Sequence, residues 1–124
     1  MSIQSAEKVA LDILRTTGVP THVTPPRNVA APYYRVARVG GTMENIVTDA
    51  ALIAISAYAA DPAVAADLAN QAREVMLAAR ASRVGGAWVR WWSEASGPSH
   101  YPDPTSKLFR YQFTGQLNIS TNLD

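Results

Sequence analysis

The sequence contains no cysteine among its 124 residues. This absence excludes a disulfide framework, a thiolate metal site, a thiol redox couple and a cysteine nucleophile. A chain of this length buries roughly two-thirds of its unfolded surface, so it needs no disulfide or metal to fold. We therefore predict one domain that spans residues 1–124.

The sequence also lacks a large excess of charge of one sign and a long hydrophobic run. Eleven Lys and Arg residues stand against ten Asp and Glu residues, a net charge of +1. This balance gives no general attraction to nucleic acid or to an anionic membrane. The longest apolar run, residues 50–60, is shorter than the roughly 20 residues that cross a bilayer. The N-terminal residues do not form a signal peptide, so we expect no membrane contact and no export.

Recognisable catalytic motifs are missing as well. The only histidines are His22 and His100, and there is no G-x-S-x-G turn and no phosphate-binding glycine loop. His100 and Asp103 could supply only two metal ligands from a proline-rich loop, so a structural loop is the preferred interpretation. We predict that the protein is not an enzyme and binds no cofactor or metal.

Two amphipathic helices are predicted. The first covers residues 5–17, with Ser5 as its N-cap and Gly18 just past its end. The second begins at Asp61-Pro62 and runs to about Ser82, with apolar residues at spacings of three and four. Many of these apolar residues are alanines, so this helix should lie close against a sheet.

The remaining segments alternate between apolar and polar residues, as strands do. A polar loop over residues 96–106 should join the last two strands as a hairpin, and Gly40-Gly41 should form a tight turn after the second. For residues 51–58 a short helix is the competing prediction. The expected fold is α+β, a two-layer domain with a mostly antiparallel sheet of about four to five strands and two helices packed on one face. The predicted strands are 21–24, 33–39, 51–58, 88–94 and 107–119.

Aromatic residues on two strands point to an interaction surface. Simple alternation puts Trp88, Arg90 and Trp92 on one face of their strand, and Val89 and Trp91 on the other. Only one face can pack against helices, so aromatic side chains should remain on the open face and mark a protein interface. The alternative is that loops 24–32 or 95–106 bury this face within the chain. The predicted interface residues are Tyr33, Tyr34, Trp88, Arg90 and Trp92.

Basic residues outnumber acidic ones between Arg73 and Arg110. The plainer interpretation is that these arginines complement the end of the second helix and form surface ion pairs. The other is a lining that attracts nucleic-acid phosphates without sequence specificity. The candidate residues are Arg73, Arg80 and Arg83.

The order of these segments resembles that of the small tail terminator, or tail completion, proteins of siphophages. The resemblance covers nearly the whole chain but is carried by short motifs. These are the N-terminal helix, Pro25-Pro26, residues 34–41, 49–55 and 61–80, Gly97-Pro98, Asp103-Pro104 and Arg110-Tyr111.

This resemblance implies a non-enzymatic virion protein that forms a ring, expected to be a hexamer, at the head-proximal end of a phage tail. Its partners would be further copies of itself, the major tail tube protein and a head completion or neck protein, and genomic DNA would pass through the lumen without sequence-specific contact. It would be made in the host cytoplasm and end tube polymerisation at the tail–neck junction. Arg73, Arg80 and Arg83 would then face the channel. The alternatives are a head completion (stopper) protein and a small nucleic-acid-binding module.

Overall fold

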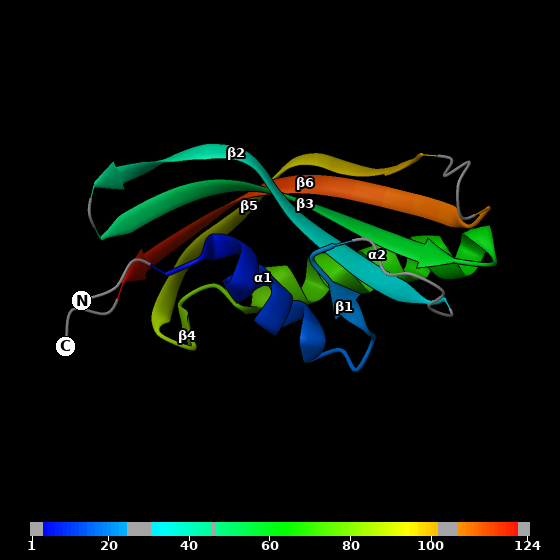
Figure 1. Cartoon of the computed structure of the whole chain (residues 1–124), viewed down its shortest axis with the longest axis horizontal. Helices are drawn as coiled ribbons and strands as arrows, with labels where there is room; N and C mark the ends of the chain where they lie inside the picture. The colour runs from blue at the N-terminus through cyan, green and yellow to red at the C-terminus, as the bar shows by residue number, and fades with distance from the viewer. Residues whose placement is uncertain (1–3, 25–30, 46, 102–106, 122–124) are drawn as a thin grey trace.

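The computed structural model describes residues 4–24, 31–45, 47–101 and 107–121. Two helices lie on one side of a long curved sheet (Figure 1). This confirms the predicted α+β class and the placement of both helices on one face. In chain order the elements are α1 (Ala6–Arg15), β1 (Thr21–His22), β2 (Tyr33–Asn45), β3 (Thr48–Ala59), α2 (Pro62–Ala78), β4 (Ser82–Val84), β5 (Ala87–His100) and β6 (Phe109–Thr121).

The sheet has six strands in the order β1-β2-β3-β6-β5-β4. The prediction of four to five strands is too low, because the three-residue strand β4 lies in the segment expected to end the second helix. The predicted pairing of β5 with β6 is confirmed, and β3 lies between β2 and β6. All pairs are antiparallel except β1 with β2. Four long strands therefore form the centre, and one short strand flanks each edge.

The predicted helix starts are confirmed by their caps. The Ser5 hydroxyl accepts a hydrogen bond from the backbone N–H of Lys8 at 3.2 Å, and Asp61 caps α2 in the same way. The end of α2 comes earlier than predicted, at Ala78. Ala81 has a φ of 58°, and its N–H bonds to the carbonyl of Val89 at 2.7 Å. This left-handed residue reverses the chain, so the segment after it pairs as β4.

The prediction of a tight turn at Gly40-Gly41 is wrong, because β2 continues through both glycines to Asn45. The pairing register shifts between Arg38 and Gly40, and Gly41 has a φ of +86°. A Cβ on Gly41 would lie 2.1 Å from the carbonyl oxygen of Ala50. Glycine here allows a bulge within a paired strand. The predicted loop also starts too early, since residues 96–100 belong to β5; residues 102–106 of the prediction lie outside the described residues.

The core lies between the sheet and the two helices. β3 is buried along almost its whole length, which confirms a strand where a short helix was the competing prediction. The alanines of α2 bring its backbone close to the sheet, as predicted: the Tyr34 hydroxyl donates to the carbonyl of Leu68 at 2.6 Å. The largest fully buried side chains include Trp92, Tyr34, Phe113, Leu14, Ile53, Ile55, Met76 and Leu117. Neither helix has the length and apolar character of a bilayer span.

Candidate assembly surface

A β-bulge in β5 decides which tryptophans are exposed. Val89 pairs with Ile119, but the next register pair joins Trp91 to Asn118, so Arg90 is an extra residue. Simple alternation stops at such a bulge. Trp88 and Trp91 are consequently 41% and 52% exposed, whereas Trp92 is 1% exposed. The predicted grouping of Trp88 with Trp92 on one face, opposite Trp91, is therefore wrong.

Trp92 belongs to the core and not to the predicted interface. Its ring meets Phe113 edge-on, with centroids 6.2 Å apart and an interplanar angle of 86°. Gly115 leaves room for this ring, because a Cβ there would lie 2.4 Å from it. The indole thus fills the space between the sheet and α2.

Tyr33 and Tyr34 are also buried, so their predicted exposure is wrong. Tyr34 points to the helix side and reaches Leu68, and burial raises its pKa to about 12. Tyr33 points to the other side, where its ring stacks on Tyr58 with centroids 4.7 Å apart and meets His22 edge-on. The adjacent strands β1 and β3 supply this cover, which the sequence of β2 alone does not reveal.

The predicted basic residues have different surroundings. Arg73 forms a bidentate ion pair with Glu94, and this hydrogen bonding raises the pKa of the Arg73 guanidinium. The guanidinium of Arg80 lies 4.2 Å from the centroid of the Trp91 ring, a cation–π contact. Arg83 is exposed on β4. These three arginines therefore do not share one unpaired basic patch.

Aromatic and basic residues gather around the start of β5, where Arg83 pairs with Trp88 across two strands and Arg80 packs on Trp91. Arg90 is exposed there, and its guanidinium lies 3.3 Å from the hydroxyl of Thr48. We name this group the β5 edge surface. Its members are Arg80, Arg83, Trp88, Arg90 and Trp91. An exposed apolar patch with arginine is the composition typical of protein interfaces.

The backbone next to this surface is also open. β4 pairs only with Ala87–Val89, and from Arg90 onward no strand in the described part of the chain pairs with the outer edge of β5. Further register shifts follow Glu94, and Pro98 lacks an N–H donor. The regular and open part of this edge is therefore Trp91–Glu94.

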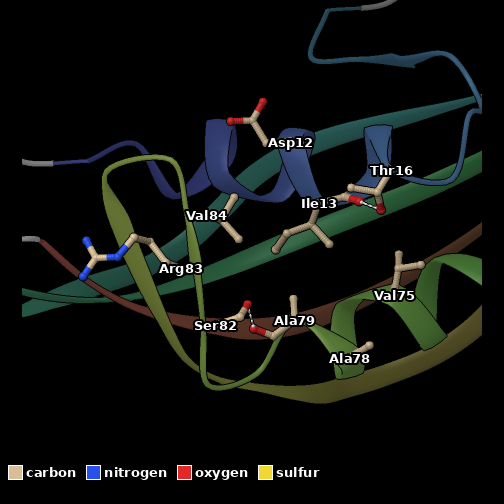
Figure 2. Close-up of a pocket in the computed structure, with 9 residues that line it drawn as sticks. All are labelled: Asp12, Ile13, Thr16, Val75, Ala78, Ala79, Ser82, Arg83 and Val84. Atoms are coloured by element: carbon tan, nitrogen blue, oxygen red, sulfur yellow. Dashed lines mark hydrogen bonds between the residues drawn. The ribbon is translucent and has the colours of Figure 1, made fainter.

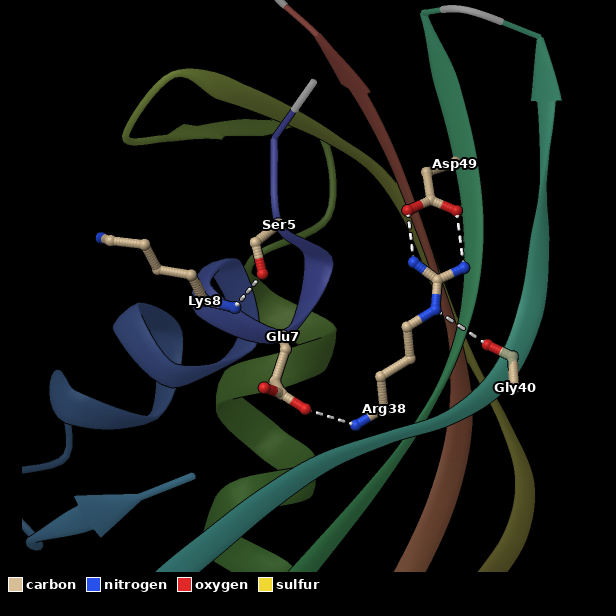
Figure 3. Close-up of polar contacts among 6 residues, drawn as sticks. All are labelled: Ser5, Glu7, Lys8, Arg38, Gly40 and Asp49. Atoms are coloured by element: carbon tan, nitrogen blue, oxygen red, sulfur yellow. Dashed lines mark hydrogen bonds and ion pairs between the residues drawn. The ribbon is translucent and has the colours of Figure 1, made fainter. Parts of the chain in front are cut away.

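The opposite edge of the sheet is closed over its first half only. β1 pairs with Tyr34 and Arg35, and the Glu7 carboxylate accepts the backbone N–H of Arg38 at 2.8 Å (Figure 3). From Val39 onward none of the described strands covers β2. Figure 1 shows the β2–β3 hairpin extending past α1 at this end of the sheet.

An ion pair holds the base of this hairpin. Arg38 donates to both carboxylate oxygens of Asp49, at 2.6 and 2.8 Å, and to the carbonyl of Gly40 at 3.0 Å (Figure 3). The hydrogen bonds to Asp49 are the main cause of a raised Arg38 pKa. Asp49 is buried and Arg38 partly exposed, so the pair fixes the two strands where the bulge would otherwise loosen them.

A separate hollow of about 390 Å³ lies between α1, the end of α2 and β4 (Figure 2). Most of its lining is apolar, with Asp12 and Arg83 as its charged residues. Asp12 already pairs with Lys8 at 3.0 Å. The two hydroxyls of the lining, those of Thr16 and Ser82, each donate to a backbone carbonyl at 2.6 Å.

The two histidines do not meet. His22 lies on β1 against the Tyr33 ring, whereas His100 lies at the end of β5 beside Phe109 and Tyr111. Their strands are four positions apart in the sheet. Within the described ranges no three His, Asp or Glu side chains gather as metal ligands, and Asp103 lies outside those ranges.

Comparison with known proteins shows the fold. No family model and no curated protein matches the sequence. A chain from the solved structure titled "Virion of native gene transfer agent (GTA) particle" is similar, with a TM-score of 0.58 and 13% sequence identity. The alignment covers 87% of this chain and 84% of that chain. At this identity the similarity shows a shared fold.

Proposed function

We propose that this protein is a structural component of a phage-like virion and that it acts as a tail terminator. The observation that carries the proposal is the fold shared with a chain of a gene transfer agent virion over 87% of the sequence. The order of sequence motifs, which resembles that of siphophage tail terminators, supports the specific role. In this role the protein forms a ring at the head-proximal end of the tail tube and binds a neck protein on its other face.

The surface of the chain suits a ring. A head-to-tail ring needs two different complementary patches on each subunit, because each copy meets two neighbours in different ways. The β5 edge surface is one such patch, and the open end of β2 lies on the opposite edge of the sheet. A binding protein of this kind needs no catalytic residues.

Electron microscopy of tail tubes assembled with the purified chain tests the proposal. We expect tubes that end in an added ring and that stop growing when the chain is present. Light scattering of the chain alone should give the mass of a closed oligomer, with a hexamer expected. A chain that binds head portals and ignores tube ends would instead be a head completion protein.

Nucleic-acid binding is less well supported, because Arg73 is paired with Glu94 and Arg80 is stacked on Trp91. Titration of the isolated chain with DNA at several salt concentrations distinguishes nucleic-acid binding from the tail terminator role. Phosphate contacts would give an affinity that falls steeply with salt. We expect only weak binding of DNA. Tight DNA binding with a steep salt dependence would contradict the proposed function.

A further inference from the structure

We infer that the partner of the β5 edge is a second copy of this chain, which docks through the open end of its β2. The inference rests on the proposed function, since it names the contact that would close the ring. The partner segment is Val39–Thr42, and it would lie antiparallel beside Trp91–Ser93 of the neighbouring copy, with Val39 in the β2 bulge at the end of the paired stretch.

The two open edges match in direction. β2 is antiparallel to β3, β3 to β6 and β6 to β5, so β2 and β5 run in opposite directions in one sheet. When a second copy is placed beside the first in the same orientation, its β2 therefore runs antiparallel to β5 of the first. This is the pairing already used across the centre of the sheet, and it is head-to-tail.

The open segments also lie at the same level along the strands. Following the register across the sheet, Thr42 is level with Ala50, Asn118 and Trp91. Gly40 is likewise level with Leu52, Gln116 and Ser93. A neighbour placed alongside without sliding would bring Gly40 opposite Ser93 and Thr42 opposite Trp91.

Contacts within the chain limit the open segment at one end of β2 and at both ends of β5. On β2, the hydrogen bond from Arg38 to Glu7 closes the edge just before Val39. On β5, β4 closes the edge before Arg90, and the register shifts after Glu94 interrupt it on the other side. The two edges are thus both open at the level of Trp91–Ser93, whereas Glu94 is level with Arg38, whose N–H is already bonded to Glu7.

The side chains are complementary in polarity and charge. The β2 segment and its tip expose Val39 and Met43, by 57% and 38%, and in this register the exposed Trp91 of the neighbour lies opposite Thr42, which stands between these two residues in the chain. Glu44, exposed and without an ion pair among the described residues, is the acidic residue of this tip. β4 prevents pairing beyond Thr42, so Glu44 would pass the outer side of β4, where Arg83 is exposed. Contact would cover apolar surface and place opposite charges together.

Disulfide cross-linking tests this contact cleanly, because the chain has no cysteine of its own. The full chain is prepared with two substitutions, Gly40→Cys and Ser93→Cys, and oxidised under native conditions. Gly40 has ordinary space for a Cβ, and Ser93 is exposed, so both changes should fold. We expect a ladder of covalent oligomers on denaturing gels. Each single variant should stay monomeric there, because a head-to-tail contact never brings two copies of one edge together.

Two further pairs control the register. Thr42→Cys with Ser93→Cys covers a slide of two residues, and Gly40→Cys with Ser99→Cys is the matched negative pair, since Ser99 lies beyond the open segment. Cysteines whose Cα atoms are more than about 7 Å apart cannot bridge. A ladder from the first or second pair, without one from the Ser99 pair, supports the contact. A dimer from Ser93→Cys alone would overturn it in favour of a symmetric β5–β5 contact.

The mass of the untreated chain separates failure of this contact from failure of the proposed function. If rings form but no pair cross-links, the contact is wrong and the tail terminator role stands. If the ladder forms but the rings do not bind tube ends, the contact stands and the role is wrong. A chain that stays monomeric at its highest soluble concentration and gives no ladder overturns the contact.

Discussion

The two aromatic-rich strands of this protein, β2 and β5, differ in what their aromatic residues do. Both have alternating sequences, yet Tyr33 and Tyr34 are buried on opposite sides of β2, whereas β5 exposes Trp88 and Trp91 and buries Trp92. The difference comes from the neighbours of β2 and from the bulge at Arg90 in β5. An aromatic residue on a strand is therefore part of the core or of the surface according to register and cover, and not according to its type.

Replacement of Trp92 should give the largest loss of stability. Trp92→Ala removes a fully buried indole and its contact with Phe113, so the free energy of unfolding should fall by about 3–5 kcal/mol. Equilibrium unfolding in urea, followed by circular dichroism, measures this change. A loss below about 1 kcal/mol would mean that the bulge does not direct Trp92 into the core.

Gly115→Ala should destabilise the same region by a smaller amount. The added Cβ would lie 2.4 Å from the Trp92 ring and 2.8 Å from the Ser93 carbonyl oxygen, and overpacking of this kind costs about 1–3 kcal/mol. Gly97→Ala is the matched control on β5, because nothing lies within 4 Å of its added Cβ. Equal effects of the two substitutions in urea unfolding would contradict the packing of Trp92 over Gly115.

On β2, Tyr34→Phe removes a buried hydrogen bond and leaves the Leu68 carbonyl without that donor. We expect a loss of about 1–2 kcal/mol in the free energy of unfolding. Tyr111→Phe provides a comparison on β6, where the tyrosine is only partly buried. If the free energy of unfolding falls equally in the two variants, the hydrogen bond from Tyr34 to Leu68 adds no stability beyond that of a partly buried tyrosine hydroxyl.

The Tyr34 hydroxyl should also make stability depend on alkaline pH. Its pKa is about 12 in the folded chain against 10.0 ordinarily, so above pH 10 the unfolded chain releases this proton while the folded chain keeps it. The contribution of the Tyr34 hydroxyl to the free energy of unfolding is fully present below pH 10. It is lost as pH rises towards 12, and the free energy of unfolding falls by at most about 1.4 kcal/mol per pH unit. Unfolding measured from pH 9 to 12 should show a shallower decline for Tyr34→Phe than for the natural chain.

Trp91→Ala should have the smallest effect on folding and a large effect on assembly. The exposed Trp91 ring stabilises the fold through its cation–π contact with Arg80, so the free energy of unfolding should change by less than about 1 kcal/mol. Light scattering should nevertheless show loss of the oligomer, because the Trp91 side chain faces the proposed neighbouring copy. An unchanged oligomer mass would show that Trp91 is not part of the assembly surface. The aromatic residues of β2 and β5 would then differ only in how they are packed within the chain.

Much of the fold could be predicted because its signals are local. Ser5 and Asp61 cap the two helices where expected, and the apolar length of β3 marks a buried strand. The alanine face of α2 indicated close contact with a sheet, and the Tyr34–Leu68 bond reflects that contact. Capping, periodicity and side-chain size act within a few residues, so one sequence is sufficient to read them.

The candidate site was predicted only in part. Trp88 and Arg90 are exposed as expected, but Tyr33, Tyr34 and Trp92 are buried. The open edges were missed because openness depends on where β1 and β4 end and on the Glu7–Arg38 bond between distant segments. The glycine pair at residues 40–41 could have indicated a bulge, but the same pair is also typical of a turn.

By itself the sequence determined a cysteine-free α+β chain with two capped helices and aromatic-rich strands, because composition, caps and periodicity are properties of neighbouring residues. Only the tertiary structure decided which tryptophans face outward and which strand edges stay open. Register shifts and edge cover arise between segments far apart in the chain, and one extra residue at Arg90 is enough to exchange buried and exposed sides.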